Sequence, residues 1–189
     1  APFGGIEQLA WSPDSKVIAY TSRKREGVAY ANSTDTDIYL YDLTTGKTRN
    51  ICKQFMSDSQ RQAWEAALKN VDFTKSLRHQ KVNSEEFQNL HPGYDVNPQF
   101  SPDGKYIAWQ SMARDGYESD LNRLCIMDIA TGKTSFVTTQ RNLDTNVDTY
   151  CWTPDSRGFY LTAVWHATSR IYHASLDGNI SQTTDDSWN

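Results

Sequence analysis

Short apolar runs separated by polar turns dominate the hydrophobic pattern of the chain, and three of these units align without gaps. They are residues 11–20 (WSPDSKVIAY), 100–109 (FSPDGKYIAW) and 152–161 (WTPDSRGFYL). Pro fixes φ, Asp accepts hydrogen bonds from nearby backbone, and the small residue that follows tolerates a positive φ. Each unit therefore predicts a tight turn that joins two strands in a hairpin.

A second hairpin follows the first in each unit. Residues 37–47 (DIYLYDLTTGK) align with residues 123–133 (RLCIMDIATGK), and residues 170–179 (RIYHASLDGN) form a looser third copy. A short run that can add an outer strand follows each copy. Two consecutive hairpins give a four-stranded antiparallel meander, which is one blade of a β-propeller.

The repeat predicts an all-β fold, a partial β-propeller of about three four-stranded antiparallel blades with a partly helical insertion. The blades are expected at residues 6–52, 93–139 and 146–184, and the insertion at residues 53–92. Because propellers close with about 4–8 blades, we expect the chain to be a fragment of a larger protein or to pair with another chain.

The spacing of the turns locates the insertion. Asp103 and Asp155 are 52 residues apart, whereas Asp14 and Asp103 are 89 apart. An insertion explains the excess, and a degraded fourth blade is the alternative. Residues 57–70 are expected to be helical, because their larger apolar side chains fall on one helical stripe.

Composition and charge agree with this fold and exclude several functions. Aromatic residues make up 12% of the chain, which suits packing on pleated faces. The net charge of −4 argues against binding nucleic acid, because there is no basic surplus to neutralise phosphates. No stretch approaches the roughly 20 apolar residues of a membrane span.

The residues that most often hold metals or cofactors show no matching pattern. Cys52, Cys125 and Cys151 form no Cys-x-x-Cys pair, so a zinc knuckle or redox motif is not predicted. The spacing leaves a disulfide between Cys125 and Cys151 open. No glycine-rich phosphate loop and no cluster with metal-ligand spacing occurs, so no cofactor and no metal is predicted.

The paired turns carry a family resemblance. The Ser-Pro-Asp-Gly-Lys turn and the Asp-x-x-Thr-Gly-Lys turn together resemble the WD-like repeat of the TolB propeller and of the amino-terminal domain of the prolyl oligopeptidase family. Residues 93–104 (GYDVNPQFSPDG) and 111–120 (SMARDGYESD) look like the propeller of the bacterial dipeptidyl-peptidase and acylaminoacyl-peptidase members of that family. The resemblance covers nearly the whole chain outside residues 53–92.

This resemblance implies that hydrolysis is performed elsewhere. The serine peptidase domain of the family carries a Gly-x-Ser-x-Gly elbow, and none of the ten glycines here forms that motif. The four histidines, His79, His91, His166 and His173, have no such serine partner in the sequence. We therefore expect a carboxy-terminal α/β-hydrolase domain outside this chain. The resemblance favours a periplasmic over a cytoplasmic location.

The resemblance also implies where substrate is bound. In the dipeptidyl-peptidases, acidic propeller residues bind the free amino terminus of the peptide, since a desolvated ammonium needs a carboxylate partner. Two places here offer carboxylates. One is the loop that contains Arg114, Glu118 and Asp120, and the other is Glu85-Glu86 in the insertion. The alternative interpretation of both places is an ordinary solvated surface. His166, in a later loop, is likewise interpreted either as facing a ligand or as an ordinary loop residue.

The sequence thus predicts a non-catalytic propeller portion of a serine peptidase of the dipeptidyl- or acylaminoacyl-peptidase type. It would gate access to the active site and bind the amino terminus of a peptide substrate through the full-length protein. The alternative is a TolB-like propeller that binds protein partners and has no hydrolase domain. Surface aromatic residues give weak support to a third hypothesis, a carbohydrate-binding or lyase propeller.

Overall fold

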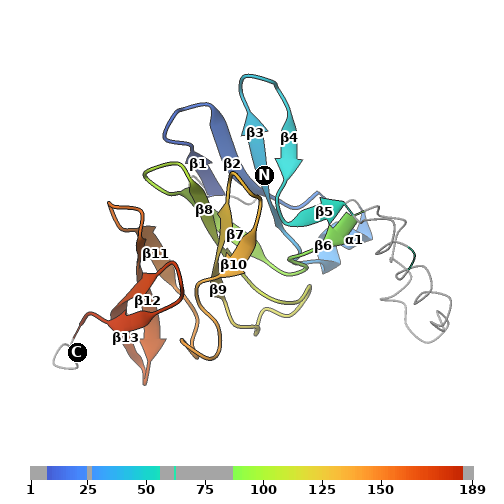
Figure 1. Ribbon diagram of the computed structural model, residues 1–189. Coiled ribbons are helices and arrows are strands. Elements are labelled where there is room, and N and C mark those ends of the chain that lie inside the picture. The colour runs from blue at the N-terminus through green and yellow to red at the C-terminus, as the bar shows by residue number, and fades with distance from the viewer. Residues whose placement is uncertain (1–7, 25–26, 56–61, 63–86, 185–189) are drawn as a thin grey trace. The chain divides into compact units, whose positions relative to one another are not determined.

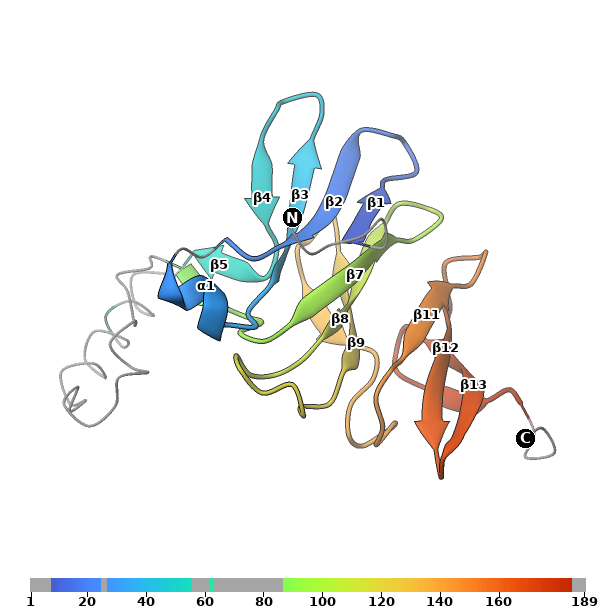
Figure 2. The ribbon, with the colours of Figure 1, turned by 180° about the vertical axis from the view of Figure 1, so that it is seen from behind.

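The computed structural model describes residues 8–24, 27–55, 62 and 87–184, and strands dominate these ranges (Figure 1). They form three four-stranded sheets and one two-stranded sheet. Within each four-stranded sheet the strands neighbour one another in chain order, and every pair is antiparallel (Figures 1 and 2). The predicted all-β fold of antiparallel four-stranded units is therefore confirmed.

The first sheet contains the first and second predicted hairpins. Its strands are β1 (Leu9–Trp11), β2 (Val17–Ser22), β3 (Asp37–Asp42) and β4 (Thr48–Asn50). A short helix, α1 (Val28–Asn32), lies in the connection from β2 to β3 and was not predicted from the sequence.

The second sheet repeats this order. Its strands are β7 (Asp95–Phe100), β8 (Tyr106–Ser111), β9 (Arg123–Asp128) and β10 (Thr134–Phe136). Its register shifts between Val96 and Gln99, where Asn97 adopts a φ of 56° and Pro98 follows it. Pro is tolerated there because β7 is an edge strand of the sheet with a local bulge.

The third sheet has the longest strands. They are β11 (Thr149–Trp152), β12 (Gly158–Trp165), β13 (Thr168–Ser175) and β14 (Ile180–Gln182). In β12, Phe159, Leu161 and Ala163 are buried, while Tyr160 and Val164 on the opposite face of the strand are exposed. This period of two is that of a strand covered on one face.

The chain divides into two compact units, and the three sheets lie in the unit made of residues 1–51 and 91–189. In the other unit, residues 52–90, strand β5 (Lys53–Phe55) pairs with β6 (Phe87–Asn89). The sequence pattern did not predict these strands, because each has only three residues. The helix expected over residues 57–70 lies outside the described residues.

One hydrogen-bond network closes the first turn of every sheet. In the first sheet, Ser12 Oγ donates to Asp14 Oδ1 at 2.7 Å and the Lys16 amide donates to the same oxygen at 3.1 Å. Asp103 and Asp155 make the same two contacts in their turns. In all three turns the hydroxyl hydrogen bond is the main cause that lowers the pKa of the carboxyl. The interpretation of the repeated aspartates as turn residues is confirmed.

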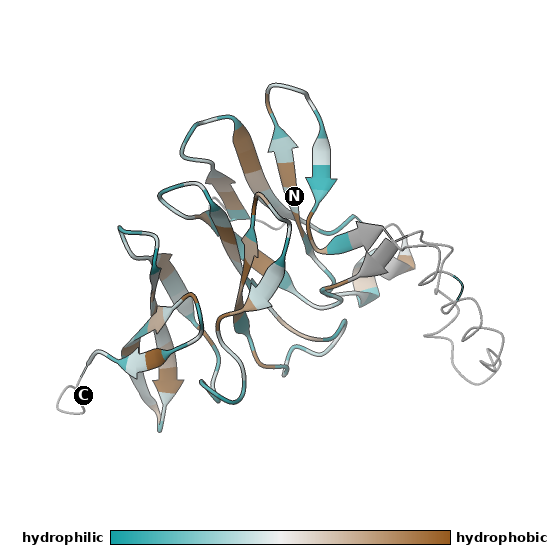
Figure 3. Ribbon diagram, viewed as in Figure 1, coloured by the Kyte–Doolittle hydropathy of each residue, from teal (hydrophilic) through white to brown (hydrophobic). Residues whose placement is uncertain are grey.

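The second and third sheets share one apolar core. Twelve buried residues form the cluster, among them Ala108 and Leu124 of the second sheet and Tyr150, Phe159 and Leu161 of the third. In Figure 3 the apolar colours lie mainly on the strands, and the turns are hydrophilic. Side chains of neighbouring residues point to opposite faces of a strand, so Ile107 and Trp109, both fully buried, lie on the other face of β8. The first sheet contacts that side of the second sheet through β7.

Candidate functional site

The loop between β8 and β9, residues 112–122, contains Arg114, Glu118 and Asp120, the described residues that the sequence analysis named as candidates for binding a peptide amino terminus. Arg114 Nε donates to the two carboxylate oxygens of Asp120 at 3.0 and 3.1 Å, and its guanidinium lies 4.1 Å from the ring centre of Tyr117. The hydrogen bond from Arg114 is the largest cause that lowers the pKa of the Asp120 carboxyl. Arg114 and Asp120 therefore form an ion pair within the loop.

Glu118 differs from Asp120 because its carboxylate is not engaged. It is exposed, and no residue of the described ranges forms a hydrogen bond or ion pair with it. Its two oxygens are available to a cationic ligand. Glu85 and Glu86, the second predicted source of carboxylates, lie outside the described residues.

Asp115 in the same loop ties the second sheet to the first. Its carboxylate accepts hydrogen bonds from Ser33 Oγ at 2.9 Å, from the Thr34 amide at 2.7 Å and from the Asp35 amide at 3.2 Å. In return, the Gly116 amide donates to Thr34 Oγ1 at 2.8 Å. This carboxylate therefore binds the connection between β2 and β3, and sequence reasoning gave it no such role.

The connection between β2 and β3 also forms hydrogen bonds with the start of β7. Thr36 forms a parallel bridge with Tyr94, and Thr36 Oγ1 donates to the Asp95 carbonyl at 2.8 Å. The Asp95 amide donates back to Thr36 Oγ1 at 3.0 Å. The connection between β2 and β3 is thus hydrogen-bonded both to the loop of residues 112–122 and to the start of β7, and we call these joined segments the rim.

Behind this rim lies a fully buried carboxyl. Asp95 has no exposed surface, and Trp109 Nε1 donates to its Oδ1 at 2.8 Å. Burial raises the pKa of Asp95 well above its usual value, and the charges of Asp37 and Asp35 raise it further. Asp95 consequently binds a proton more tightly in the folded chain than in the unfolded one.

A serine, a histidine and an aspartate meet here without forming a catalytic triad. His91 Nδ1 lies 3.3 Å from Ser111 Oγ and 3.9 Å from Asp95 Oδ1. A triad histidine uses one ring nitrogen for the serine and the other for the carboxylate, whereas both distances here run to the same nitrogen. All three residues are buried. Burial, followed by the charge of Arg123, lowers the pKa of His91 to about 4, so its ring is neutral at pH 7.

His166 lies at the tip of the hairpin between β12 and β13. His166 and Ala167 have φ values of 51° and 63°, which is the conformation of a two-residue hairpin turn that normally selects Gly or Asn. Trp165 and His166 are exposed, with ring centres 4.9 Å apart. This loop joins the same pair of strands in the third sheet as residues 112–122 do in the second, and it presents an aromatic surface.

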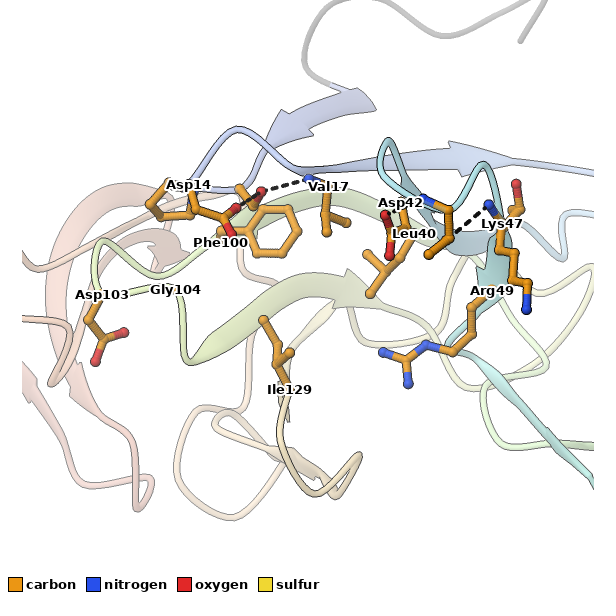
Figure 4. Close-up of a pocket in the computed structure, with 14 residues that line it drawn as sticks. Asp14, Val17, Leu40, Asp42, Lys47, Arg49, Phe100, Asp103, Gly104 and Ile129 are labelled. Atoms are coloured by element: carbon orange, nitrogen blue, oxygen red, sulfur yellow. Dashed lines mark hydrogen bonds between the residues drawn. The ribbon is translucent and has the colours of Figure 1, made fainter.

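A groove of about 700 Å³ opens between the first two sheets, beside the repeated turns and not beside the loops just described. Figure 4 shows Leu40 of the first sheet, Phe100 of the second sheet and Ile129, which directly follows β9, lining it. Lys47 and Arg49 add positive charge, whereas the aspartates of the lining are engaged by their own turns. The sequence did not reveal the groove, since its walls come from two repeats.

The structure contains no disulfide among the three cysteines, all of which belong to described residues. Cys125 is buried and Cys151 is exposed, so the disulfide that the sequence left open is not formed. No helix in the described ranges combines the length and apolar character needed to cross a membrane.

Comparison with known sequences identifies relatives over nearly the whole chain, although no family model matches it. The chain is 42% identical to dipeptidyl-peptidase 5 of Porphyromonas gingivalis over 184 residues, which is 97% of this chain. It is 40% identical over 126 residues, 67% of the chain, to dipeptidyl-peptidase 5 of Porphyromonas endodontalis. The aligned region is 21% of the first relative and 13% of the second, so the chain spans about a fifth of the length of the former.

Solved structures show the same fold at lower identity. TolB from Acinetobacter baumannii superposes with a TM-score of 0.54 and 22% identity, covering 95% of this chain and 32% of that one. The β-propeller domain of the Trilobed protease from Pyrococcus furiosus gives a TM-score of 0.51 and 13% identity, covering 96% of this chain and 42% of that one. These likenesses establish the propeller fold. The chain is therefore a β-propeller segment homologous to part of the dipeptidyl-peptidase 5 proteins.

Proposed function

We propose that the chain is the non-catalytic propeller portion of a serine peptidase of the dipeptidyl-peptidase type. The observation that carries this proposal is its similarity to dipeptidyl-peptidase 5 over nearly its whole length. The sequence has no Gly-x-Ser-x-Gly elbow, and the one described Ser-His-Asp grouping is buried with the wrong geometry. Hydrolysis then belongs to a domain outside this chain.

In this proposal, the loop of residues 112–122 supplies a carboxylate for the amino terminus of the peptide. Glu118 is the residue assigned to that contact, because its carboxylate is exposed and unengaged. An ammonium that loses water on binding is stabilised by a charge-assisted hydrogen bond of this kind. Arg114 and Asp120 would hold the loop in place through their ion pair, and Asp115 would fix it to the first sheet. Glu85 and Glu86 remain candidates for a second carboxylate.

The rim also supports a gating role. Loops that select substrates by size must keep a fixed distance from one another. Here hydrogen bonds join the connection between β2 and β3 to the loop of residues 112–122 and to the start of β7. The hairpin with Trp165 and His166 offers an exposed aromatic surface for contact with peptide side chains. Size selection and amino-terminus binding would then be properties of one rim.

The test compares the 189-residue chain with the full-length protein from the same gene on dipeptidyl and acylaminoacyl chromogenic substrates. The chain alone should give no turnover, whereas the full-length protein should release dipeptides and lose activity with a serine-directed inhibitor. Inhibitor-sensitive hydrolysis by the chain alone would contradict the division of labour. A full-length protein without hydrolase activity that binds protein partners would favour the TolB-like alternative.

A further inference from the structure

The groove between the first two sheets is lined by three residues that are smaller than their equivalents at the next interface, between the second and third sheets. The larger equivalents in the aligned repeat are Tyr106 for Val17, Trp152 for Phe100 and Ser156 for Gly104. Protein interiors otherwise pack closely, so smaller residues at one copy of a repeated interface leave unfilled volume there.

The interface between the second and third sheets shows the same packing with the larger residues. The rings of Tyr106 and Trp152 stack with their centres 6.3 Å apart. The hydroxyl of Tyr150 donates to the Ala108 carbonyl at 3.0 Å, which holds the first strand of the third sheet against the second sheet. Because Val17 has no ring, the corresponding pair between the first two sheets cannot stack.

The turns at one end of the groove cannot form a hydrogen bond that joins the turns of the next two sheets. There, the Asp103 amide donates to Ser156 Oγ at 3.1 Å. Gly104, the equivalent of Ser156, has no hydroxyl to accept a hydrogen bond from the Asp14 amide. The turn itself accepts serine, because Ser15 and Ser156 have φ values of 60° and 61° where Gly104 has 71°. Glycine at this position therefore leaves the groove open without being required by the turn.

The other end of the groove is cationic. Figure 4 shows Lys47 and Arg49 at one end of the lining and Asp14 and Asp103 at the other. Lys47 and Arg49 are exposed, and no carboxylate of the described residues forms an ion pair with either. The carboxylate of Asp42, which also lines the groove, accepts hydrogen bonds from two backbone amides of its own turn.

Arg49 is a further difference between the two interfaces. It lies opposite Leu40 in the strand register, as Ser135 lies opposite Ile126 in the second sheet. Residues directly opposite each other share a face of the sheet, so Arg49 is on the face that Leu40 presents to the groove. The interface with less apolar volume thus carries a positive charge where the next one carries a small neutral residue.

We infer that this groove binds an extended peptide segment of a partner protein, in which a bulky apolar side chain lies next to a carboxylate. The apolar side chain packs among Leu40, Phe100 and Ile129, and the carboxylate accepts charge-assisted hydrogen bonds from Arg49. The volume of about 700 Å³ lies within the range of roughly 300–1,000 Å³ that is typical of ligand sites. This inference does not depend on the peptidase assignment.

The lining favours a peptide over a lipid-like anion. Thr45 and Thr48 place hydroxyl groups beside the apolar residues. Thr48 belongs to β4, the edge strand of the first sheet, and among the described residues the outer side of β4 pairs with no strand. The amide groups of a peptide can bond to these hydroxyl and backbone groups, whereas an acyl chain would cover them without replacing their hydrogen bonds to water.

The test measures the fluorescence anisotropy of a labelled peptide mixed with the full-length protein from the same gene. The peptide has a Leu-Phe centre flanked by glutamates, and both its ends are blocked, so the amine contact assigned to Glu118 cannot hold it. Val17→Tyr adds the ring of the next interface and should weaken binding about 10-fold, because the space for one large apolar side chain is lost. Gly104→Ser adds less volume and should weaken binding about 3-fold.

A pair of arginine variants tests the charge. Arg49→Ser adopts the residue of the next interface and should weaken binding about 3-fold at low salt, with a smaller salt dependence than the wild type. Arg141→Ser, at an exposed arginine of another loop, is the matched control and should bind as the wild type does. Urea unfolding shows which variants are folded, and Gly104→Ser tests the groove even if Val17→Tyr is not.

The outcomes separate the occupants of the groove. Binding that Val17→Tyr and Gly104→Ser leave unchanged overturns the inference, as does the absence of binding at about 1 mM protein. Equal affinity for a peptide with lysines in place of the glutamates also contradicts it. Displacement of the peptide by an equal concentration of decanoate would show that the occupant is a lipid-like anion. Binding by a full-length protein without peptidase activity would refute the proposed function and support this inference.

Discussion

Replacing Asp115 by Ala should loosen the contact between the first two sheets. The carboxylate accepts hydrogen bonds from Ser33 Oγ and from the amides of Thr34 and Asp35, at 2.7–3.2 Å. Ser33 and Asp35 are buried, so their donors are not rehydrated unless the connection between β2 and β3 opens. A hydrogen bond to a charged group contributes about 1.5–3 kcal/mol, and Asp115 is itself exposed, so solvent replaces part of the loss. We expect the free energy of unfolding to fall by about 2 kcal/mol.

The assay is urea unfolding followed by tryptophan fluorescence. Asp144→Ala removes an exposed carboxylate from another loop of the same protein and serves as the matched control, with an expected change within about 0.5 kcal/mol. A double-mutant cycle with Ser33→Ala should give a coupling energy of about 1 kcal/mol, because each variant removes one side of the same contact. An Asp115→Ala variant as stable as Asp144→Ala would refute the role assigned to Asp115 in joining the first two sheets.

Three further predictions follow from the site and the core. Glu118→Gln in the full-length protein should raise KM about 10-fold for peptides with a free amino terminus and leave kcat nearly unchanged. The control Asp144→Asn should alter neither constant, and an equal rise in KM for amino-blocked peptides would exclude the assigned contact. His91 has its pKa lowered from 6.5 to about 4, so it stabilises the fold fully above pH 6.5, and this contribution is lost as the pH falls toward 4. His91→Gln should therefore flatten the acid limb of a urea-unfolding pH series, and an unchanged slope would count against a buried neutral ring. Gly158→Ala should destabilise the third sheet by about 2 kcal/mol or more in the same unfolding assay, because a Cβ there would lie 2.5 Å from the Ala174 carbonyl oxygen; wild-type stability would mean that the close approach of these two strands is not real.

The parts of the fold that the sequence predicted are the local ones. The Pro-Asp turn and the Thr-Gly turn each encode a hairpin within about a dozen residues, and both recur, so the order of strands in each sheet could be read directly. Asp14 and its two equivalents act on their own turns, as expected from residues two positions apart. Strands β5 and β6 escaped prediction because three residues carry almost no periodic signal.

The candidate site was predicted only in part, since its contacts join residues far apart in the sequence. The loop with Arg114 and Glu118 was identified from its charges and its place between two strands. The role of Asp115 was not, because its partners lie about 80 residues earlier and no local pattern links them. The ion pair between Arg114 and Asp120 was likewise not predicted, and it engages the Asp120 carboxylate, whereas the Glu118 carboxylate makes no such contact with the described residues.

The most direct test of the central claim is the structure of the full-length protein with a peptide analogue bound. The three sheets should be consecutive blades of one ring, with Tyr150 still bonded to the Ala108 carbonyl and the loop of residues 112–122 facing the catalytic serine of another domain. If that loop instead faces away from the peptide, or if the three sheets are not neighbours in one propeller, the account of this chain as the substrate-facing portion of a peptidase is wrong.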